Sequence, residues 1–258
     1  MSLTSTKNPR LQGIRRAAAA GRLTEDGLAV IEGPHLLAEA LRSSWEIAEV
    51  FVTAAAHQRN EALIHGVPAP ITELSPRAMA SIAATENTQE IVGLIRQRQW
   101  TWWDLLTDKP VILALDGVQD PGNAGTMVRS AEAFGASGIV FTKGSVRSSN
   151  GKFIRATAGS IFRVPFLEGL DVSDLLRHVQ QARLPVYALA PKGSLGLREA
   201  SLADGGVLVV GSEGSGVSAE LLSAAKTVRI PTLKVESLNA AVACSVALYS
   251  MQQGRERT

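Results

Sequence analysis

The feature that most constrains the fold is a short apolar run that ends in a glycine-rich turn. Residues 207–211, VLVVG, are apolar throughout, and residues 212–216, SEGSG, follow directly. Such a run is typical of a strand buried on both faces of a parallel sheet. Glycines allow the backbone to approach a ligand closely, and ligands of open parallel sheets bind at the carboxyl ends of strands. The segment therefore predicts an α/β protein with a binding site at this strand end.

A second apolar run, residues 111–118, is followed by an Asp-Pro-Gly turn at 120–122. Asn123 suits the N-cap of a helix and Gly135 suits the residue after it. Arg129 lies about two turns into this predicted helix, away from its apolar face. Two interpretations stay open at this point: Asn123 and Arg129 are site residues, or Asn123 is only a cap and Arg129 an exposed side chain paired with Glu132.

A third segment, residues 235–249, places polar side chains where a helix of small residues begins. Ser237 and Asn239 lie at the predicted helix start, where free N–H groups and the positive end of the helix dipole can meet a ligand. Ser237 as a simple N-cap explains the pattern about as well. One face of this helix is predicted to be apolar, from the spacing of Leu238, Val242, Val246 and Tyr249.

Strands and helices are predicted to alternate along the whole chain, and in the second part this favours a parallel sheet covered by helices on both faces. The first part has predicted strands at 27–33, 48–53, 71–74 and 90–96 and helices at 34–45, 54–65 and 76–84. The second has strands at 111–118, 138–142, 162–166, 185–190, 207–211 and 228–230 and helices at 123–134, 172–183, 218–225 and 237–251. We expect a small α/β domain at 1–98, a linker at 99–109 and a larger domain at 110–258. The three tryptophans of the linker are interpreted as buried anchors rather than as base-stacking groups.

Composition excludes several classes of protein. The 258 residues are 45% apolar and 19% charged, which is ordinary for a globular chain. The single cysteine, Cys244, cannot form an internal disulfide or a thiolate metal cluster and fits a reducing cytoplasm. The four histidines lack metal-ligand spacing, so no metal is expected. We find no signal peptide and no apolar span long enough for a membrane.

The net charge is only +2, but two segments contain cations and no acid. They are residues 1–22 and residues 142–164, and such clusters are the electrostatic footprint of phosphate binding. A solvated basic surface is the alternative, and it is the better explanation for one such cluster but not for two. The predicted RNA-binding residues are Lys7, Arg10, Arg15, Arg16, Lys152 and Arg155.

The three segments, in this order, resemble the three motifs of the SpoU (TrmH-type) family of RNA methyltransferases, in the SPOUT superfamily. The matching positions are Asn123 and Arg129, then Gly211, Glu213 and Gly216, then Ile230, Pro231, Ser237, Leu238 and Asn239. Residues 152–165 are also similar to the family. The chain departs from the family at residues 232–236, which are one residue shorter than usual and lack a glycine, and at Ala240, where valine is common.

The resemblance implies a fold. The C-terminal domain should be a SPOUT-type parallel sheet with a trefoil knot, which general rules of topology would have argued against. The N-terminal domain resembles a small ribosomal-protein-like RNA-binding domain, with Asn-Pro-Arg at 8–10 and Ile-Glu-Gly at 31–33 as typical features. Relatives complete their sites across a dimer, so a homodimer through the C-terminal domain is expected.

The resemblance also implies a reaction: a methyl group passes from S-adenosyl-L-methionine to a ribose 2′-hydroxyl of RNA, and S-adenosyl-L-homocysteine is left. Arg129, Asn123, Glu213, Ser237 and Asn239 are the implied catalytic residues. Leu189, Ala190, Gly211, Gly216, Ile230 and Leu238 are the implied cofactor-binding residues. A guanidinium is a poor base, so Arg129 is interpreted as holding an RNA phosphate and stabilising the developing alkoxide.

Three functions are considered. The first is an RNA methyltransferase, and the separate N-terminal domain favours ribosomal RNA over transfer RNA as its substrate. A non-catalytic RNA-binding protein on the same scaffold is the second possibility, but such a protein has no need of the five implied catalytic residues. A dinucleotide-binding enzyme is a poor third, because the glycine fingerprint between strand and helix is missing.

Overall fold

The computed structural model describes residues 5–43, 45–85 and 88–252 of the chain. The chain forms two compact units. Unit 1 contains residues 1–99 together with residues 147–163, and unit 2 contains residues 100–146 and 164–258. The domain boundaries predicted from the sequence, at residues 98 and 110, place residues 147–163 in the second domain.

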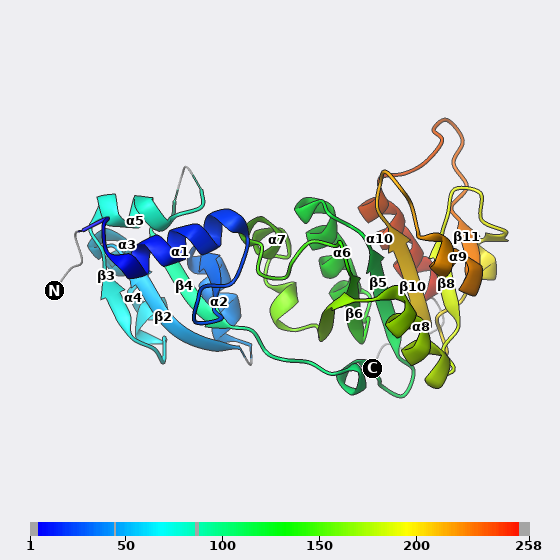
Figure 1. Cartoon of the computed structure of the whole chain (residues 1–258), viewed down its shortest axis with the longest axis horizontal. Helices are drawn as coiled ribbons and strands as arrows, with labels where there is room; N and C mark the ends of the chain where they lie inside the picture. The colour runs from blue at the N-terminus through cyan, green and yellow to red at the C-terminus, as the bar shows by residue number, and fades with distance from the viewer. Residues whose placement is uncertain (1–4, 44, 86–87, 253–258) are drawn as a thin grey trace. The chain divides into compact units, whose positions relative to one another are not determined.

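Unit 1 is built on a four-stranded sheet (Figure 1). Its strands are β1 (Ala29–Glu32), β2 (Glu46–Val52), β3 (Ile71–Glu73) and β4 (Ile91–Arg96), in the order β1-β4-β2-β3. Strands β1 and β2 are antiparallel to β4, and β3 is parallel to β2. The helices are α1 (Pro9–Ala20), α2 (Pro34–Leu41), α3 (Ala54–Arg59), α4 (Glu61–His65), α5 (Pro76–Ile82), α7 (Gly151–Ala156) and the 3-10 turn η2 (Ser160–Phe162).

Helix α1 was not predicted, although its ends carry clear signals. The Asn8 side chain accepts a hydrogen bond from the backbone of Arg10, and Gly21 ends the helix with a φ of 59°. Leu11 and Ile14 are buried and pack with α5 against the sheet. Only Gln12 and Gly13 separate these two apolar side chains, but Arg15 and Arg16 follow directly, so the segment has no continuous apolar run that would indicate a buried helix.

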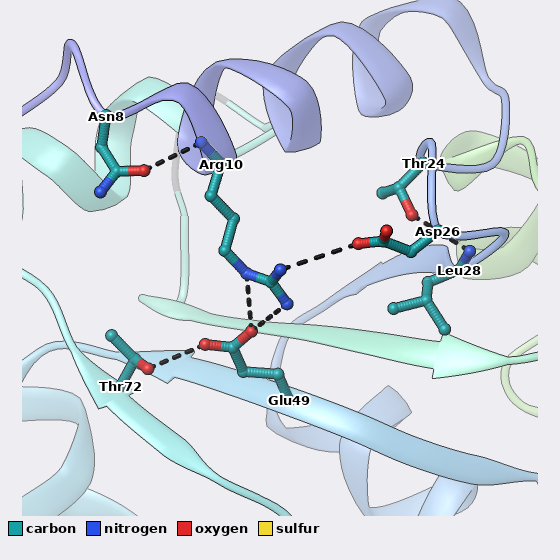
Figure 2. Close-up of polar contacts among 7 residues, drawn as sticks. All are labelled: Asn8, Arg10, Thr24, Asp26, Leu28, Glu49 and Thr72. Carbon is teal, nitrogen blue, oxygen red and sulfur yellow. Dashed lines mark hydrogen bonds and ion pairs between the residues drawn. The ribbon is translucent and has the colours of Figure 1, made fainter.

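Arg10 ties the start of α1 to the sheet (Figure 2). Its guanidinium donates to Glu49 of β2, with Nε 2.9 Å from Oε2, and it lies 3.7 Å from Asp26. The other oxygen of Glu49 accepts a hydrogen bond from Thr72 of β3 at 2.9 Å. Two carboxylates therefore already occupy this guanidinium, which was predicted to bind RNA. The arginine stabilises the fold of unit 1.

Residues 147–163 pack onto unit 1 through polar and apolar contacts. The Ser149 hydroxyl donates to the Gly21 carbonyl at 3.0 Å, and Trp45 meets Phe162 edge-on at 5.0 Å. Glu39, only 8% exposed, accepts hydrogen bonds from both Arg42 and Arg163. The predicted strand at 162–166 is wrong: its first residue closes a 3-10 turn, and β7 begins only at Phe166.

Replacing Glu39 tests this packing. Glu39→Ala removes the buried carboxylate that accepts from Arg42 and Arg163, and we expect the free energy of unfolding to fall by about 2 kcal/mol. Amide hydrogen exchange of residues 147–163 should become faster, because a local opening exposes them. The control is Glu25→Ala, an exposed partner of Arg16 at 3.5 Å, which should change stability by less than about 0.5 kcal/mol. Equal exchange in the two variants would contradict the role given to Glu39.

Unit 2 is built on a seven-stranded sheet in which every pair of neighbouring strands is parallel, as predicted. The strand order is β7-β6-β5-β10-β8-β11-β9. The strands are β5 (Val111–Asp116), β6 (Gly138–Thr142), β7 (Phe166–Leu170), β8 (Val186–Leu189), β9 (Leu195–Gly196), β10 (Gly206–Gly211) and β11 (Lys226–Arg229). The helices are α6 (Pro121–Ala133), α8 (Val172–Gln181), α9 (Ala219–Ala224) and α10 (Ala240–Met251), with the 3-10 turns η1 (Trp102–Leu105) and η3 (Leu197–Glu199).

Helices cover both faces of this sheet (Figure 1). On one face, α8, α9 and η1 pack over alternate residues of β5 and β10, including Ile112 and Val207. On the other, α6 and α10 pack against each other and against the sheet. Trp102 is 6% exposed and stacks on His178 at 4.8 Å, so the interpretation of a buried anchor is confirmed for this tryptophan. For Trp103, which is 77% exposed, that interpretation is wrong. None of the helices in the described residues is both long and apolar enough to cross a membrane.

Candidate active site

The site is organised where two central strands end side by side. Gly211, the last residue of β10, pairs with Asp116, the last residue of β5. Asp116 is buried, and its carboxylate accepts hydrogen bonds from the Thr142 hydroxyl at 3.0 Å and from the Ser218 backbone at 2.7 Å. These bonds join β5, β6 and the start of α9. Sequence reasoning missed Asp116, whose only signal was a carboxylate closing an apolar run.

Helix α6 begins two residues earlier than predicted, and the prediction of Asn123 as its N-cap is wrong. The cap is Asp120, whose side chain accepts a hydrogen bond from the Asn123 backbone at 2.7 Å. Pro121 follows at the first helical position, where its missing N–H costs nothing. The cap leaves the Asn123 side chain available for other contacts.

Helix α10 begins at Ala240, three residues later than predicted, and its N-cap is Asn239. The Asn239 Oδ1 accepts from the backbone N–H of Ala241 at 2.9 Å and of Val242 at 3.3 Å. The interpretation of Ser237 as the cap is therefore wrong. Ser237 lies in the preceding loop and lines a cavity instead.

The three motifs meet in one cluster of hydrogen bonds, which we call the Asn-Glu-Asn cluster. Asn123 donates from Nδ2 to Oε1 of Glu213 at 2.6 Å. Asn239 donates from Nδ2 to the same oxygen at 2.9 Å and to Oδ1 of Asn123 at 3.1 Å. Residues far apart in the sequence thus come from α6, from the turn after β10 and from the start of α10.

A cavity of about 430 Å³ lies on one side of this cluster, across the ends of β8, β10 and β11. All six predicted cofactor-binding residues line it: Leu189, Ala190, Gly211, Gly216, Ile230 and Leu238. Five more apolar or small side chains continue the wall, those of Pro191, Val210, Val228, Ala240 and Ala243. Glu213, Glu236, Ser237 and Asn239 supply the polar side chains of the lining together with Ser212. A chamber lined by apolar side chains together with a few polar groups is typical of a small-molecule site.

A second cavity, of about 310 Å³, adjoins the first. It is lined by residues 117–120, Asn123, residues 212–215 and Ala240. Ser212, Glu213 and Ala240 border both cavities, while Asn123 borders the second and Asn239 the first. The residues of the Asn-Glu-Asn cluster therefore line both of these adjoining chambers, where two ligands could meet.

Arg129 is exposed on α6 and lines neither cavity. Within the described part of the chain it has no ion pair or side-chain hydrogen bond, so the alternative of a pair with Glu132 is wrong. The six predicted RNA-binding residues all lie in unit 1. No group of histidine, cysteine and acidic side chains suited to a metal ion occurs among residues 5–43, 45–85 and 88–252.

Glycine is required at position 211 by a close approach of the backbone. A Cβ there would lie 2.0 Å from the carbonyl carbon of Gly216. The turn after β10 folds back on the strand, and the Gly216 N–H donates to the Ser212 carbonyl at 2.8 Å. This fold-back presents the Glu213 carboxylate to both asparagines.

A parallel sheet with two adjoining chambers at its carboxyl edge, both lined by polar side chains, defines an α/β enzyme that brings two ligands together. Residues 110–249, more than half of the chain, match the SpoU rRNA Methylase family. The chain therefore belongs to this family and is an RNA methyltransferase that uses S-adenosylmethionine. Residues 8–93 match the MRM3-like substrate binding domain.

Known proteins resemble the chain over nearly its whole length. A Bacillus subtilis protein named 23S rRNA (guanosine(2553)-2′-O)-methyltransferase RlmP is 29% identical over 252 residues, which cover 97% of this chain and 98% of the relative. An uncharacterized tRNA/rRNA methyltransferase of Synechocystis is 31% identical, over 98% of this chain and 93% of that protein. The structure of an AdoMet-bound rRNA methyltransferase from Sinorhizobium meliloti superposes with a TM-score of 0.85, at 29% identity, covering 98% and 97% of the two chains.

The first cavity suits S-adenosylmethionine on its own features. Its volume lies within the range of small-molecule sites, and apolar side chains from Leu189, Val228 and Leu238 form a wall suited to an adenine ring. The backbone at Gly216 is not shielded by a side chain, and a Cβ added there would meet nothing within 4 Å, so this backbone can approach polar edges of a ligand. When bound, the cofactor supplies the methyl group as an electrophile.

A methyl group added at position 211 tests this geometry. Gly211→Ala should lower the free energy of unfolding by about 2 kcal/mol, because the neighbouring backbone must move. It should also weaken binding of S-adenosylmethionine at least tenfold, a loss of about 1.4 kcal/mol, measured by isothermal titration calorimetry. The matched control is Gly214→Ala in the same turn, where an added Cβ meets nothing within 4 Å. Cofactor affinity in Gly211→Ala equal to that in Gly214→Ala would contradict the assignment.

Proposed function

We propose that the chain transfers a methyl group from S-adenosylmethionine to a ribose 2′-hydroxyl of ribosomal RNA. The observation that carries this proposal is the Asn-Glu-Asn cluster, whose residues line both a cavity of about 430 Å³ and an adjoining one of about 310 Å³. The Bacillus subtilis relative, which matches the chain along nearly its full length, is named for 2′-O-methylation of 23S rRNA. The family match itself is to rRNA methylases.

The residues of the chain have separate tasks in this proposal. Leu189, Ala190, Gly211, Gly216, Ile230 and Leu238 hold the cofactor. Ser237 and Asn239 line its polar end, next to Glu213. The ribose enters the second cavity, where Asn123 and Glu213 orient its hydroxyl groups by hydrogen bonds. Fixed polar groups at the point of transfer lower the barrier in two ways. They hold the reacting atoms together, and they need no reorganisation of solvent as charge develops.

Arg129 has a separate role in the same proposal. It is exposed and has no acidic partner in the described residues, so its charge is available to RNA. Its guanidinium holds the phosphate next to the target ribose and stabilises the alkoxide that develops as the hydroxyl loses its proton. Since it lines neither cavity of its own chain, it serves the site of a second copy.

Arg129→Ala should lower the rate of methyl transfer at least about a hundredfold, the usual scale for removing one group that stabilises developing charge. Affinity for S-adenosylmethionine should stay unchanged, because the arginine lies outside the cofactor cavity. Incorporation of tritiated methyl into RNA and calorimetric titration of the cofactor measure the two effects. Arg177→Ala, which removes an exposed arginine paired with Asp174, is the control and should keep full activity. Near wild-type turnover in Arg129→Ala would remove the arginine from the mechanism.

We further propose that two copies associate through α10. Val242, Val246 and Tyr249 are 49%, 38% and 53% exposed and recur at helical spacing, which leaves an apolar stripe on this helix. The buried residues of α10, among them Cys244 and Leu248, lie on the opposite side and pack within the unit. An apolar stripe beside the site favours a partner that completes it, in line with the role given to Arg129.

The dimer has its own test. Val246→Asp places a charge in the stripe and should give a monomer at micromolar concentration, by light scattering, with methyl transfer lost and the cofactor still bound. Leu23→Asp changes an equally exposed apolar side chain in unit 1 and should leave the oligomeric state unchanged. If the wild-type chain is already a monomer under these conditions, shared sites are contradicted.

Transfer RNA is the second candidate substrate, supported by the name of the Synechocystis relative, a tRNA/rRNA methyltransferase. Mapping of 2′-O-methyl groups in total RNA, with and without the gene, decides between the two. If the protein only binds RNA, the maps with and without the gene should be the same, and S-adenosylmethionine should not raise its thermal stability. In either case we place its action in the cytoplasm, where both RNAs are modified in bacteria.

A further inference from the structure

Unit 1 contains a polar cavity of about 680 Å³ that lies outside the site described above. Its walls come from the C-terminal half of α1, from the end of α5 and from the start of α7. The side chains of Arg15, Lys152 and Arg155 line it. The two basic segments of the sequence, which lie far apart along the chain, therefore meet in one place.

The charges of this cavity are not balanced within the chain. Among the described residues, none of the three cations has an ion pair or a side-chain hydrogen bond, and no acidic residue lines the cavity. Arg10 and Arg16 on the same helix differ, because Glu49 and Glu25 pair with them. Three clustered cations without counter-charges repel one another, and bound anions relieve that repulsion.

The shape of the cavity also points to a chain of phosphates. Apart from Ile82 and Asn150, the other lining residues are small, such as Ala18, Ala19 and Ala80. Their backbone is therefore accessible, and the volume exceeds what a single inorganic anion fills. The floor is fixed, since Asn150 caps α7 and Ser149 bonds to the Gly21 carbonyl. A fixed cationic groove of this width can hold a sugar-phosphate backbone without reading bases.

We propose that this cavity, which we call the α1–α7 groove, binds the phosphodiester backbone of a single-stranded segment of the RNA substrate through Arg15, Lys152 and Arg155. The proposal rests on the proposed function for the identity of the ligand as RNA. Residues 147–163 lie inside the segment that matches the methylase family. In this proposal they bind substrate together with residues of the N-terminal segment. Of the six predicted RNA-binding residues, the groove contains Arg15, Lys152 and Arg155.

The test uses the full chain and a fluorescent single-stranded RNA of about twelve nucleotides, within the range that one binding groove covers. Each lost phosphate contact on single-stranded RNA lowers the slope of log affinity against log salt by about 0.7, so the triple variant Arg15→Ala/Lys152→Ala/Arg155→Ala should show a slope shallower by about two. At 0.1 M salt, the same contacts correspond to a loss of affinity of about a hundredfold. The unfolding temperature and the affinity for S-adenosylmethionine should match those of the wild type.

The control is Arg77→Ala/Arg96→Ala/Arg177→Ala, which removes the same net charge from positions that do not line the groove. It should change the slope by less than about 0.5, because long-range charge is screened at this salt concentration. A second variant, Ala80→Trp, fills the groove and keeps all three cations, and it should weaken RNA binding as well. An equal loss in the control triple, or wild-type affinity in the groove variants, would overturn the proposal.

Competition separates the possible sources of the phosphate. Adenosine monophosphate and inorganic phosphate should displace the RNA only at millimolar concentration, because each offers one phosphate to three cations. Displacement at micromolar concentration would mean a free-nucleotide site and would overturn the proposal. If the wild type methylates RNA and the triple variant of the groove methylates it with an unchanged KM, the role of the groove is refuted but the proposed function is not. If the wild type binds RNA through the groove but methylates none, the proposed function fails and the groove stands.

Discussion

The pairing of β5 with β10 is the constraint on which the site depends. Both strands are buried on both faces, and a shift of one residue would exchange the side chains that face the two helical layers. Asp116 holds the end of β5 in place through Thr142 of β6 and the backbone of Ser218. The turns that follow β5 and β10 therefore emerge side by side. That position brings Asn123 to Glu213, although 90 residues separate them in the sequence.

The capping of two helices determines how the asparagines are used. Asp120 satisfies the first N–H groups of α6, so the Asn123 amide is available for the cluster. Asn239 serves both purposes. The N–H groups of α10 require an oxygen, which fixes Oδ1 toward the helix and leaves Nδ2 for Glu213 and Asn123. The start of α10 thus sets the orientation of the Asn239 amide. That orientation lets both asparagines donate to Oε1 of Glu213.

Much of unit 2 could be predicted because its signals are local. Short apolar runs gave β5, β6 and β10, and the resemblance to known motifs gave the six residues that line the first cavity. Cap positions could not be predicted, since Asp120 and Asn123, or Ser237 and Asn239, are equally good caps by residue type. Choosing between them needs the partner, Glu213, which tertiary structure supplies. Asp116 was missed for the same reason: a carboxylate at a strand end is informative only once Thr142 and Ser218 are beside it. The knot implied by the resemblance stays a prediction.

The least predictable feature was the membership of residues 147–163 in unit 1, because it depends on contacts distant in sequence. The chain passes between the two units at 99–100, 146–147 and 163–164, so the first unit is not a simple N-terminal appendage. Removal of residues 1–98 would take away Gly21 and Glu39, which bond to Ser149 and Arg163. It would also uncover Phe162, which packs against Trp45. Burial of these groups is favourable only while both stretches are present. A truncated chain would therefore lose part of its own methylase-family segment as an ordered structure, and its activity would report on that loss as well as on RNA recognition. Substitutions at single positions, which keep this packing, separate the two effects.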